Sequence, residues 1–418
     1  MATSNKFIKG VKIVFLILLT IISENMNLKK RKIAVFTGNR AEYGLQYPVL
    51  KALSQHPEIE YYLLVSGAHL KEDFGHTLKE IESDGFKIHA QIQINMPGDN
   101  LFSTAQAIGS GILNLSPVLN NLNPDFLVVY ADRFEGFSAL ITGTQMGIPT
   151  AHIEGGDYTE GGALDDSVRH AMTKLAHIHF TTNEQAAERI KRMGEEHWRI
   201  FNVGMPVLDL VAEKKYADKN DIYKKYKLNP EKPILIFTQH SVTTEFEQAT
   251  KQILPLLKAL EECATEMNCQ VIITYPNDDA GGKRIIHEIV KLAEKNNPLI
   301  QIHQSLGRYY YHGVLNVAAA CIGNSSSGIK ETPAFHCPCI NIGNRQQGRL
   351  RGNNVIDVGY DKNELKQAVL KCLNNKEFKE QVCVCKNPYG AGNSGLRIAE
   401  VLATTEINKT LIQKQMTY

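Results

Sequence analysis

The chain has 418 residues, which is long enough for two domains that each bury a core of their own. Its 46 lysines and arginines stand against 44 aspartates and glutamates, and the formal charge of +2 argues against a protein built to bind nucleic acid or to coat an anionic membrane. With 43% hydrophobic and 22% charged residues, the composition also excludes collagen, coiled coil, multi-span membrane protein and a wholly disordered chain.

An apolar stretch at 13–22 follows Lys9 and Lys12 and has the shape of a signal-peptide core. It is too short to span a bilayer comfortably, and no small-x-small cleavage site follows it. Met26 stands just before a basic run and the first clear strand, so we interpret the stretch as an upstream translation artefact or a weak anchor. We exclude 1–31 from the fold and expect no stable membrane insertion.

From Lys32 onward, short β-branched apolar runs alternate with stretches of helical period, which predicts parallel sheets covered by helices. The expected strands are 33–36, 62–65, 126–130, 151–153, 178–180, 200–203, 234–237, 271–275, 300–302, 320–322, 339–342 and 355–358. We therefore expect an α/β fold of two domains, 32–212 and 233–395, joined by a polar linker region at 213–232. A C-terminal helix and tail at 396–418 are expected to return to the first domain.

The eight cysteines are too sparse for a disulfide scaffold, which favours a reducing, cytoplasmic location. The two Cys-x-Cys pairs lack the two-residue spacing of a zinc knuckle, so we expect buried thiols and no metal site.

Candidate chemistry in the first half lies just after strands, because open parallel sheets bind ligands at the carboxyl ends of their strands. Arg40 stands in the turn after the first strand. A guanidinium and the free N–H groups at the start of a helix can bind a phosphate. An ordinary surface turn explains the segment equally well. This turn has neither the glycine pattern of a dinucleotide fold nor the lysine of a P-loop.

Acidic residues follow the next strands of the first domain. Asp132, with Arg133 beside it, follows 126–130, and Glu154 follows 151–153. Asp165 or Asp166 can cap the next helix, and this structural role would explain one of the two aspartates. A salt bridge would likewise explain the presence of Asp132 and Arg133. Close carboxylates repel, which raises at least one pKa and leaves a proton donor beside a base. The group of Asp132, Glu154 and Asp165 therefore indicates acid/base catalysis.

Three segments of the second half also carry polar groups after strands. His240 follows 234–237, although a lone histidine is more often structural, and Asn277 lies in a turn rich in hydrogen-bonding groups after 271–275. The run 323–331 offers glycines and serines, including Ser325 and Ser326, through which a diphosphate can meet the backbone at a helix start. Glu331 at its end can accept hydrogen bonds from ribose hydroxyls, so this run indicates a nucleotide diphosphate.

Between about 33 and 395, the sequence closely resembles the hydrolysing UDP-N-acetylglucosamine 2-epimerases of sialic-acid-type sugar biosynthesis. The motifs that carry the resemblance occur in order: Asn-Arg-Ala-Glu-Tyr, Ala-Asp-Arg-Phe-Glu, His-Ile-Glu-Gly-Gly, Asp-Asp-Ser-Val-Arg-His, Gln-His-Ser-Val-Thr-Thr, Gly-Asn-Ser-Ser-Ser-Gly and Asn-Arg-Gln-Gln-Gly-Arg. The resemblance implies a glycosyltransferase-B-like fold, with two Rossmann-like halves around a cleft, usually as a homodimer or homotetramer.

In this family the proton on carbon 2 of the hexosamine is removed while the nucleoside diphosphate leaves carbon 1, and water then adds to the glycal. The resemblance implies a nucleotide-sugar substrate and no cofactor, with release of UDP and N-acetylmannosamine. By motif, Asp132, Glu154 and Asp165 would be the acid/base carboxylates, with Arg133 and His240 beside the diphosphate or the sugar. The nucleotide would be held by Arg40, Asn277, Ser325, Ser326, Glu331 and Arg345.

Three alternatives remain open. A hydrolysing epimerase of nucleotide-linked N,N′-diacetylbacillosamine, on the way to legionaminic acid, fits the loop 158–163, which is longer than in the common family pattern. A non-hydrolysing epimerase would carry Thr-Arg-Pro-Glu and His-Val-Glu-Ala-Gly where this chain has Asn-Arg-Ala-Glu and His-Ile-Glu-Gly-Gly. A fold that only senses a sugar nucleotide is disfavoured because all three carboxylates and His240 are present.

Overall fold

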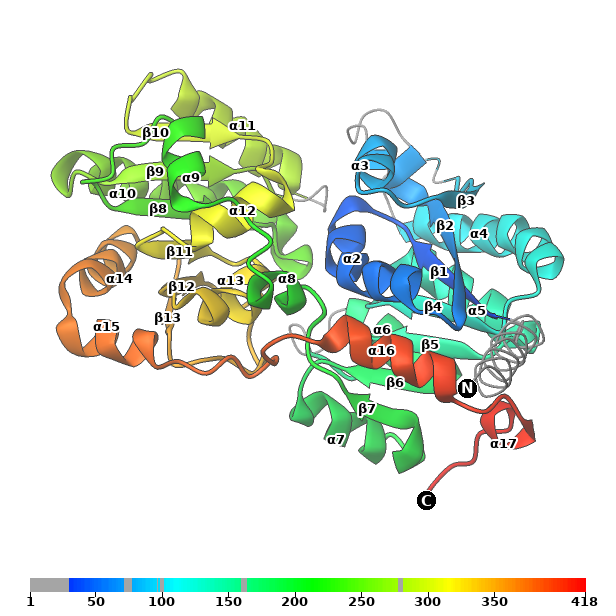
Figure 1. Cartoon of the computed structure of the whole chain (residues 1–418). Coiled ribbons are helices and arrows are strands. Elements are labelled where there is room, and N and C mark those ends of the chain that lie inside the picture. The colour runs from blue at the N-terminus through cyan, green and yellow to red at the C-terminus, as the bar shows by residue number, and fades with distance from the viewer. Residues whose placement is uncertain (1–29, 71–76, 96, 98–100, 159–163, 277–280) are drawn as a thin grey trace, which may run out of the picture.

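The computed structural model describes residues 30–418 except 71–76, 96, 98–100, 159–163 and 277–280 (Figure 1). The apolar stretch at 13–22 and the predicted site residue Asn277 lie outside the described residues. No helix within the described ranges is both long and apolar enough to cross a membrane.

The first lobe is built on a seven-stranded parallel sheet in the order β3-β2-β1-β4-β5-β6-β7 (Figure 1). Its strands are β1 Arg31–Thr37, β2 Ile59–Ser66, β3 Ile88–Ile92, β4 Phe126–Tyr130, β5 Thr150–Ile153, β6 Ile178–Thr181 and β7 Ile200–Asn202. Its helices are α2 Arg40–Gln55, α3 Thr77–Ser83, α4 Leu101–Leu122, α5 Phe134–Gln145, α6 Leu164–Leu175 and α7 Glu184–Arg192, with short 3₁₀ turns η1 Gly67–Leu70 and η3 His197–Arg199.

The second lobe is built on a six-stranded parallel sheet in the order β10-β9-β8-β11-β12-β13. Its strands are β8 Ile234–Thr238, β9 Gln270–Thr274, β10 Ile300–His303, β11 Ala320–Gly323, β12 Cys339–Ile342 and β13 Val355–Val358. Its helices are α9 Lys219–Lys225, α10 Ala249–Glu266, α11 Gly282–Ala293, α12 Gly307–Leu315, α13 Ser326–Lys330, α14 Lys362–Asn374 and α15 Lys376–Cys383, with η4 Thr243–Gln248 and η5 Thr332–Phe335. The predicted fold class, two parallel-sheet α/β units, is confirmed.

Helices cover both faces of the first sheet, which explains why its central strand β4 is buried at every position. Successive side chains of a strand point to opposite faces. Accordingly, Ile33 and Val35 of β1 pack in one core with residues of α2, while Ala34 and Phe36 pack in a second core with residues of α4 and α5. All twelve predicted strands are present. The edge strand β3 was not predicted, because its five residues alternate between buried and exposed positions and contain only three apolar side chains.

The C-terminal end of the chain lies on the first lobe, where α16 Ser394–Thr404 packs against α2 (Figure 1). Ile398 and Leu402 are fully buried in the same core as Ile33. Arg31 adds a hydrogen bond of 2.7 Å to the carbonyl of Leu402. A last short helix, α17 Lys409–Ile412, buries Leu411 in the same core.

The polar segment 213–232 packs into the core of the second lobe instead of forming a free tether. It contains α9, whose Ile222 is fully buried together with Ala217, Ile234 and Ile236. The preceding short helix α8 Leu208–Ala212 lies where the chain passes between the lobes (Figure 1). The Asp209 carboxylate of α8 accepts hydrogen bonds from the backbone N–H groups of Ser394 and Gly395, at 2.8 and 2.7 Å, where the chain returns.

Candidate functional site

The neighbouring strands β4 and β5 end in residues with unusual backbone conformation. Ala131, directly after β4, has φ of 56°, and Glu154, directly after β5, has φ of 67°. Left-handed conformations of non-glycine residues cost about 1–3 kcal/mol each and are concentrated at functional sites. The two strands pair in register, with Tyr130 opposite Ile153, so the predicted Asp132 and Glu154 follow adjacent strand ends.

Arg169 of α6 binds Asp132 from the first lobe's own helix layer. Its Nη2 donates to Oδ2 of Asp132, and its Nη1 donates to Oδ1 of Asp166 at 2.8 Å. The arginine side chain is 2% exposed, and a buried charge is costly unless it is paired. The two carboxylates balance the positive charge of Arg169. Asp165, the predicted member of the adjacent pair, is exposed in the first turn of α6, and its neighbour Asp166 takes the buried position.

Lys330 joins the two lobes at Glu154. This lysine ends α13 of the second lobe, and its Nζ donates both to Oε1 of Glu154 and to Oδ2 of Asp157. All three side chains are at most 7% exposed. Sequence reasoning missed Lys330 because no local pattern shows that a lysine three residues after a serine run faces the other lobe. Its position inside the Gly-Asn-Ser-Ser-Ser-Gly-Ile-Lys-Glu segment was the one available signal.

Buried hydrogen-bonding residues support these strand ends. His152 hydrogen-bonds the carbonyl of Ala131 at 2.6 Å through Nε2, and burial lowers its pKa to about 4, so the ring is neutral at neutral pH. The Tyr130 hydroxyl is buried beside Glu154, and burial followed by the charge of that carboxylate raises the pKa of Tyr130 well above its ordinary value. Among the described residues, none hydrogen-bonds Oε2 of Glu154.

His240 lies at the end of β8, in the second lobe, as predicted from the sequence. Its backbone N–H donates to Oδ1 of Asn324 at 2.7 Å, and its carbonyl accepts from the Asn324 amide at 2.8 Å, which fixes the β8 end to the β11 end. Arg345 donates to the carbonyl of Asn324 at 3.0 Å. Burial, with a contribution from Arg345, lowers the pKa of His240 to about 3. The ring is therefore neutral and can donate one hydrogen bond but cannot supply a positive charge.

The serine run begins a helix of five residues, and Ser325 is its N-cap. Ser326 is the first helical residue and is partly exposed. Glu331, which directly follows this helix, is buried and its Oε2 lies 2.6 Å from Nε2 of His312 in α12. His312 was not predicted, and it leaves Oε1 of Glu331 for any further partner. The predicted residues Ser325, Ser326, Glu331 and Arg345 therefore gather around the end of β11.

The remaining predicted arginines are partly exposed. Arg40 pairs with Glu80 of α3 at 3.0 Å, and Arg133 pairs with Glu135 at 3.3 Å. Glu135 is 2% exposed and lies beside Glu42, which is buried at the start of α2. Burial, with a smaller contribution from Glu135, raises the pKa of Glu42 to about 8. The loop 158–163 is described only at Tyr158, whose carbonyl accepts a hydrogen bond of 2.8 Å from Arg349 of the second lobe.

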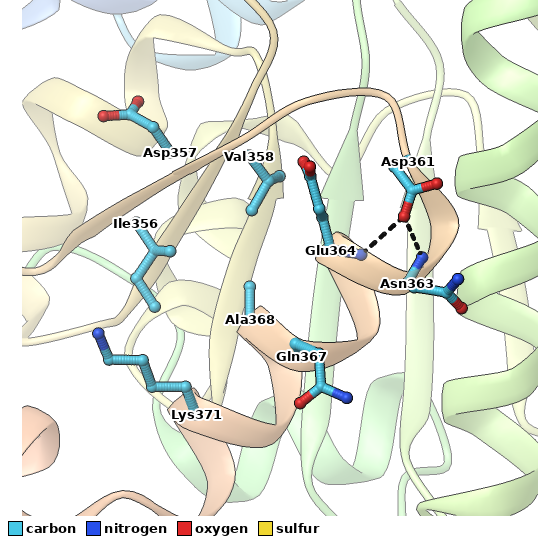
Figure 2. Close-up of a pocket in the computed structure, with 9 residues that line it drawn as sticks. All are labelled: Ile356, Asp357, Val358, Asp361, Asn363, Glu364, Gln367, Ala368 and Lys371. Carbon is cyan, nitrogen blue, oxygen red and sulfur yellow. Dashed lines mark hydrogen bonds between the residues drawn. The ribbon is translucent and has the colours of Figure 1, made fainter.

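An open pocket of about 480 Å³ lies elsewhere, between β13 and α14 (Figure 2). Its polar groups serve the local structure: Asp361 caps α14 by accepting hydrogen bonds from the backbone of Asn363 and Glu364 (Figure 2). It contains none of the predicted site residues, and we assign it no role in the chemistry. Within the described ranges, no group of three or more His, Cys, Asp or Glu side chains is arranged to hold a metal ion.

The eight cysteines are free thiols, seven of them buried. For those at the second sheet, including Cys321, Cys337 and Cys339, burial raises the thiol pKa above its ordinary value. They are therefore packed as small apolar groups.

Two parallel α/β sheets with polar strand ends directed to a shared interface define a glycosyltransferase-B-like fold. A crystal structure of UDP-GlcNAc 2-epimerase from Neisseria meningitidis bound to UDP-GlcNAc shares this fold with a TM-score of 0.77 at 17% identity, covering 90% of this chain and all of that one. Residues 51–403 match the family of UDP-N-acetylglucosamine 2-epimerases, so the chain belongs to that family and is a nucleotide-sugar epimerase.

Two curated relatives extend the comparison. The GDP/UDP-N,N′-diacetylbacillosamine 2-epimerase (hydrolyzing) of Campylobacter jejuni is 36% identical, covering 84% of this chain and 90% of the relative. The UDP-N,N′-diacetylbacillosamine 2-epimerase (hydrolyzing) of Legionella pneumophila is 33% identical, covering 93% of this chain and all of the relative.

Proposed function

We propose that the protein is a hydrolysing 2-epimerase that converts a UDP-linked 2-acetamido sugar into UDP and the free 2-epimer. The observation that carries the proposal is the pair of carboxylates at adjacent strand ends, Asp132 and Glu154, each held by a buried cation. A carbon-bound proton beside an anomeric centre is a weak acid, so its removal requires a positioned base. Two carboxylates in different surroundings can serve as base and acid in turn.

The reaction then proceeds in two balanced steps. A carboxylate takes the proton from carbon 2, the electron pair forms a double bond to carbon 1, and the bond from carbon 1 to the diphosphate oxygen breaks with its electrons leaving on UDP. In the second step, the other carboxyl group, in its protonated form, gives its proton to the opposite face of carbon 2, a water oxygen adds to carbon 1, and the proton that the water loses returns to this carboxylate. The first carboxyl group releases the carbon 2 proton to solvent before the next turnover. We assign Asp132 and Glu154 to these two roles, with Asp165 as the third carboxylate of the family motif.

The second lobe is proposed to hold the nucleotide. Ser325, Ser326, Glu331 and Arg345 gather near the end of β11, and Arg40, Arg133 and Asn277 complete the proposed set. A departing diphosphate needs cationic or N–H donors, and the arginines supply positive charge while His240, neutral in its buried position, supplies a hydrogen bond. No cofactor is part of the proposal.

For the sugar, we propose UDP-N,N′-diacetylbacillosamine as the first substrate to test. The two curated relatives described above carry that substrate in their names. UDP-N-acetylglucosamine, which would yield N-acetylmannosamine, is the second candidate, because the family bears its name and the Neisseria meningitidis structure is bound to UDP-GlcNAc. The product would feed synthesis of a legionaminic or sialic acid, respectively.

We further propose that the protein acts in the cytoplasm as a homodimer or homotetramer. Its first domain is 32–212, and its second domain, predicted as 233–395, also includes the segment with α9, because Ile222 is buried in the same core as Ile234. The support is the family resemblance and the free thiols. Light scattering after gel filtration tests the assembly, and a monomer would contradict it.

The proposed reaction is tested by incubating the protein with each UDP-sugar in deuterated water. The expected products are UDP and a free 2-epimer with deuterium at carbon 2, and the sugar that reacts with the higher kcat/KM is the substrate. A nucleotide-bound epimer would instead identify a non-hydrolysing enzyme. Binding of both sugars without turnover would identify a sensor.

A further inference from the structure

Lys330 is the one described residue of the second lobe whose side chain hydrogen-bonds Glu154. Its backbone is fixed as well, since its carbonyl accepts a hydrogen bond of 2.8 Å from Asn387, and its Nζ lies 5.3 Å from the centre of the Tyr389 ring. The ammonium is 1% exposed and therefore cannot exchange its two carboxylate partners for water. Glu154 and Asp157 are in consequence held by the same atom.

The charges of this triad do not cancel. Two ionised carboxylates and one ammonium give a net charge of −1 in a buried site. Burial favours the neutral form of Asp157. The charge and hydrogen bond of Lys330, together with the charge of Arg349 and the backbone N–H of Tyr158, outweigh burial, so the pKa of Asp157 lies below its ordinary value. Without the ammonium, the two buried carboxylates would repel each other, and one would take up a proton.

We propose that Lys330 is a positioning residue that holds Glu154 beside Asp157 from the opposite lobe and thereby controls the pH dependence of the proton transfer at sugar carbon 2. This inference rests on the proposed function. It assigns to the second lobe a part in the proton transfer as well as in nucleotide binding. It also couples the two tasks, because Lys330 adjoins Glu331 and lies within five residues of Ser325 and Ser326.

Other ionisable groups face the triad and remain in place when Lys330 is changed. On the first lobe the group is Tyr130, and on the second lobe they are Arg349, Arg351, Tyr389 and Glu331. Tyr130 lies directly beside Glu154, and the other side chains influence the triad through space. They set a constant background against which the effect of Lys330 can be measured.

The first variant is Lys330→Met, which keeps most of the length of the unbranched side chain and removes its charge. We expect the acidic limb of the kcat profile to move upward by about one pH unit or more, since the site must lose an additional proton before it can act. At pH 7, kcat should fall about tenfold or more and recover in part at pH 9, with a smaller change in KM. Lys291→Met is the matched control, because Lys291 is an exposed lysine of the same lobe that pairs with one carboxylate, Glu288, away from the triad.

The double variant Lys330→Met/Asp157→Asn separates charge from packing. It restores the net charge of the triad from −2 to −1, so we expect the acidic limb to return toward that of the wild-type protein. An unshifted limb in the single variant, or a double variant with no better activity than the single one, would overturn the proposal. If Lys330→Met alone does not fold, the double variant is expected to fold, and its failure would count against the charge argument.

A measurement without substrate keeps this inference apart from the proposed function. In the wild-type protein, Asp157 has a lowered pKa. Its ionised form therefore stabilises the fold at pH values above the ordinary pKa of an aspartate, and this stabilisation is lost as the pH falls. In Lys330→Met, the uncompensated carboxylates oppose folding increasingly as the pH rises. The difference in Tm between the two proteins should therefore grow from pH 5 to pH 8. A difference in Tm that stays constant with pH contradicts the role of Lys330. If the difference in Tm grows but the wild-type protein shows no turnover, only the proposed reaction is contradicted.

Discussion

Asp132 and Glu154 are each bound by a buried cation that also contacts a second carboxylate. Arg169 retains Asp166 when Asp132 is changed, and Lys330 retains Asp157 when Glu154 is changed. A buried ion pair is strongly destabilised when one charge is left without a partner. Neutral substitutions at Asp132 and Glu154 avoid this, because each cation keeps its second carboxylate.

We accordingly expect Asp132→Asn and Glu154→Gln to fold and to lower kcat about a hundredfold or more, because each removes a proton donor or acceptor. UDP affinity, measured by calorimetry, should change little, since most of the residues assigned to the nucleotide lie on the other lobe and neither substitution removes one of them. Glu188→Gln, which changes an exposed ion pair of α7, is the control. Near-normal turnover in both site variants would remove these residues from the mechanism.

At the scale of elements, the turn from β1 into α2 buries a carboxyl group that is protonated at neutral pH. Glu42 accepts hydrogen bonds from Gln46 at 2.8 Å and from the backbone of Gly38 at 3.3 Å. Burial and the neighbouring Glu135 raise its pKa from 4.5 to about 8. Between these values the folded chain holds a proton that the unfolded chain has released, so Glu42 opposes folding increasingly as the pH rises through this window.

Glu42→Gln should remove this dependence. We expect the Tm of the variant relative to wild type to be higher at pH 8 than at pH 5, as measured by thermal unfolding in buffers of equal ionic strength. Glu58→Gln, at an exposed position before β2, should show no such trend. An equal difference at both pH values would show that Glu42 is ionised in the folded protein.

The elements themselves could be predicted from the sequence because buried parallel strands are apolar along their whole length. A second rule, that ligands bind where parallel strands end, predicted Asp132, Glu154 and His240, and the structure places all three just after strands. Arg169, His312 and Lys330 could not be found in this way. Their partners lie 37, 19 and 176 residues away, and only the packing of helices α6, α12 and α13 brings them together. The packed state of 213–232 was missed for a related reason, because its polar composition conceals the buried Ile222.

At the scale of the whole molecule, the chain ends on the lobe in which its first strand lies. Leu402 of α16 is fully buried in the core beneath β1, whereas Leu396 of the same helix is 61% exposed. The C-terminal helix therefore stabilises the first lobe and keeps the chain crossing beside Asp209 in place.

Leu402→Ala is expected to reduce the free energy of unfolding by about 2–5 kcal/mol, the usual range for a buried leucine. Leu396→Ala on the same helix is the control and should change it by less than about 0.5 kcal/mol. Denaturant unfolding measures both. Equal, small effects of the two substitutions would mean that α16 is not part of the core of the first lobe.

The two lobes meet through contacts that join the proposed catalytic and nucleotide-binding segments. Lys330 reaches Glu154 and Asp157, Arg349 reaches the carbonyl of Tyr158, and the Arg308 guanidinium lies 4.1 Å from the centre of the Tyr47 ring. In the proposed reaction, one substrate therefore contacts both lobes, with its sugar beside the first and its diphosphate beside the second.

The most direct measurement follows UDP release from a UDP-sugar that carries deuterium at carbon 2, with NMR analysis of the sugar formed in ordinary water. We predict slower release than from the undeuterated substrate and a free sugar that has lost its deuterium. Equal rates together with deuterium retained at carbon 2 would show that this bond is never broken and would contradict the proposed roles of Asp132 and Glu154.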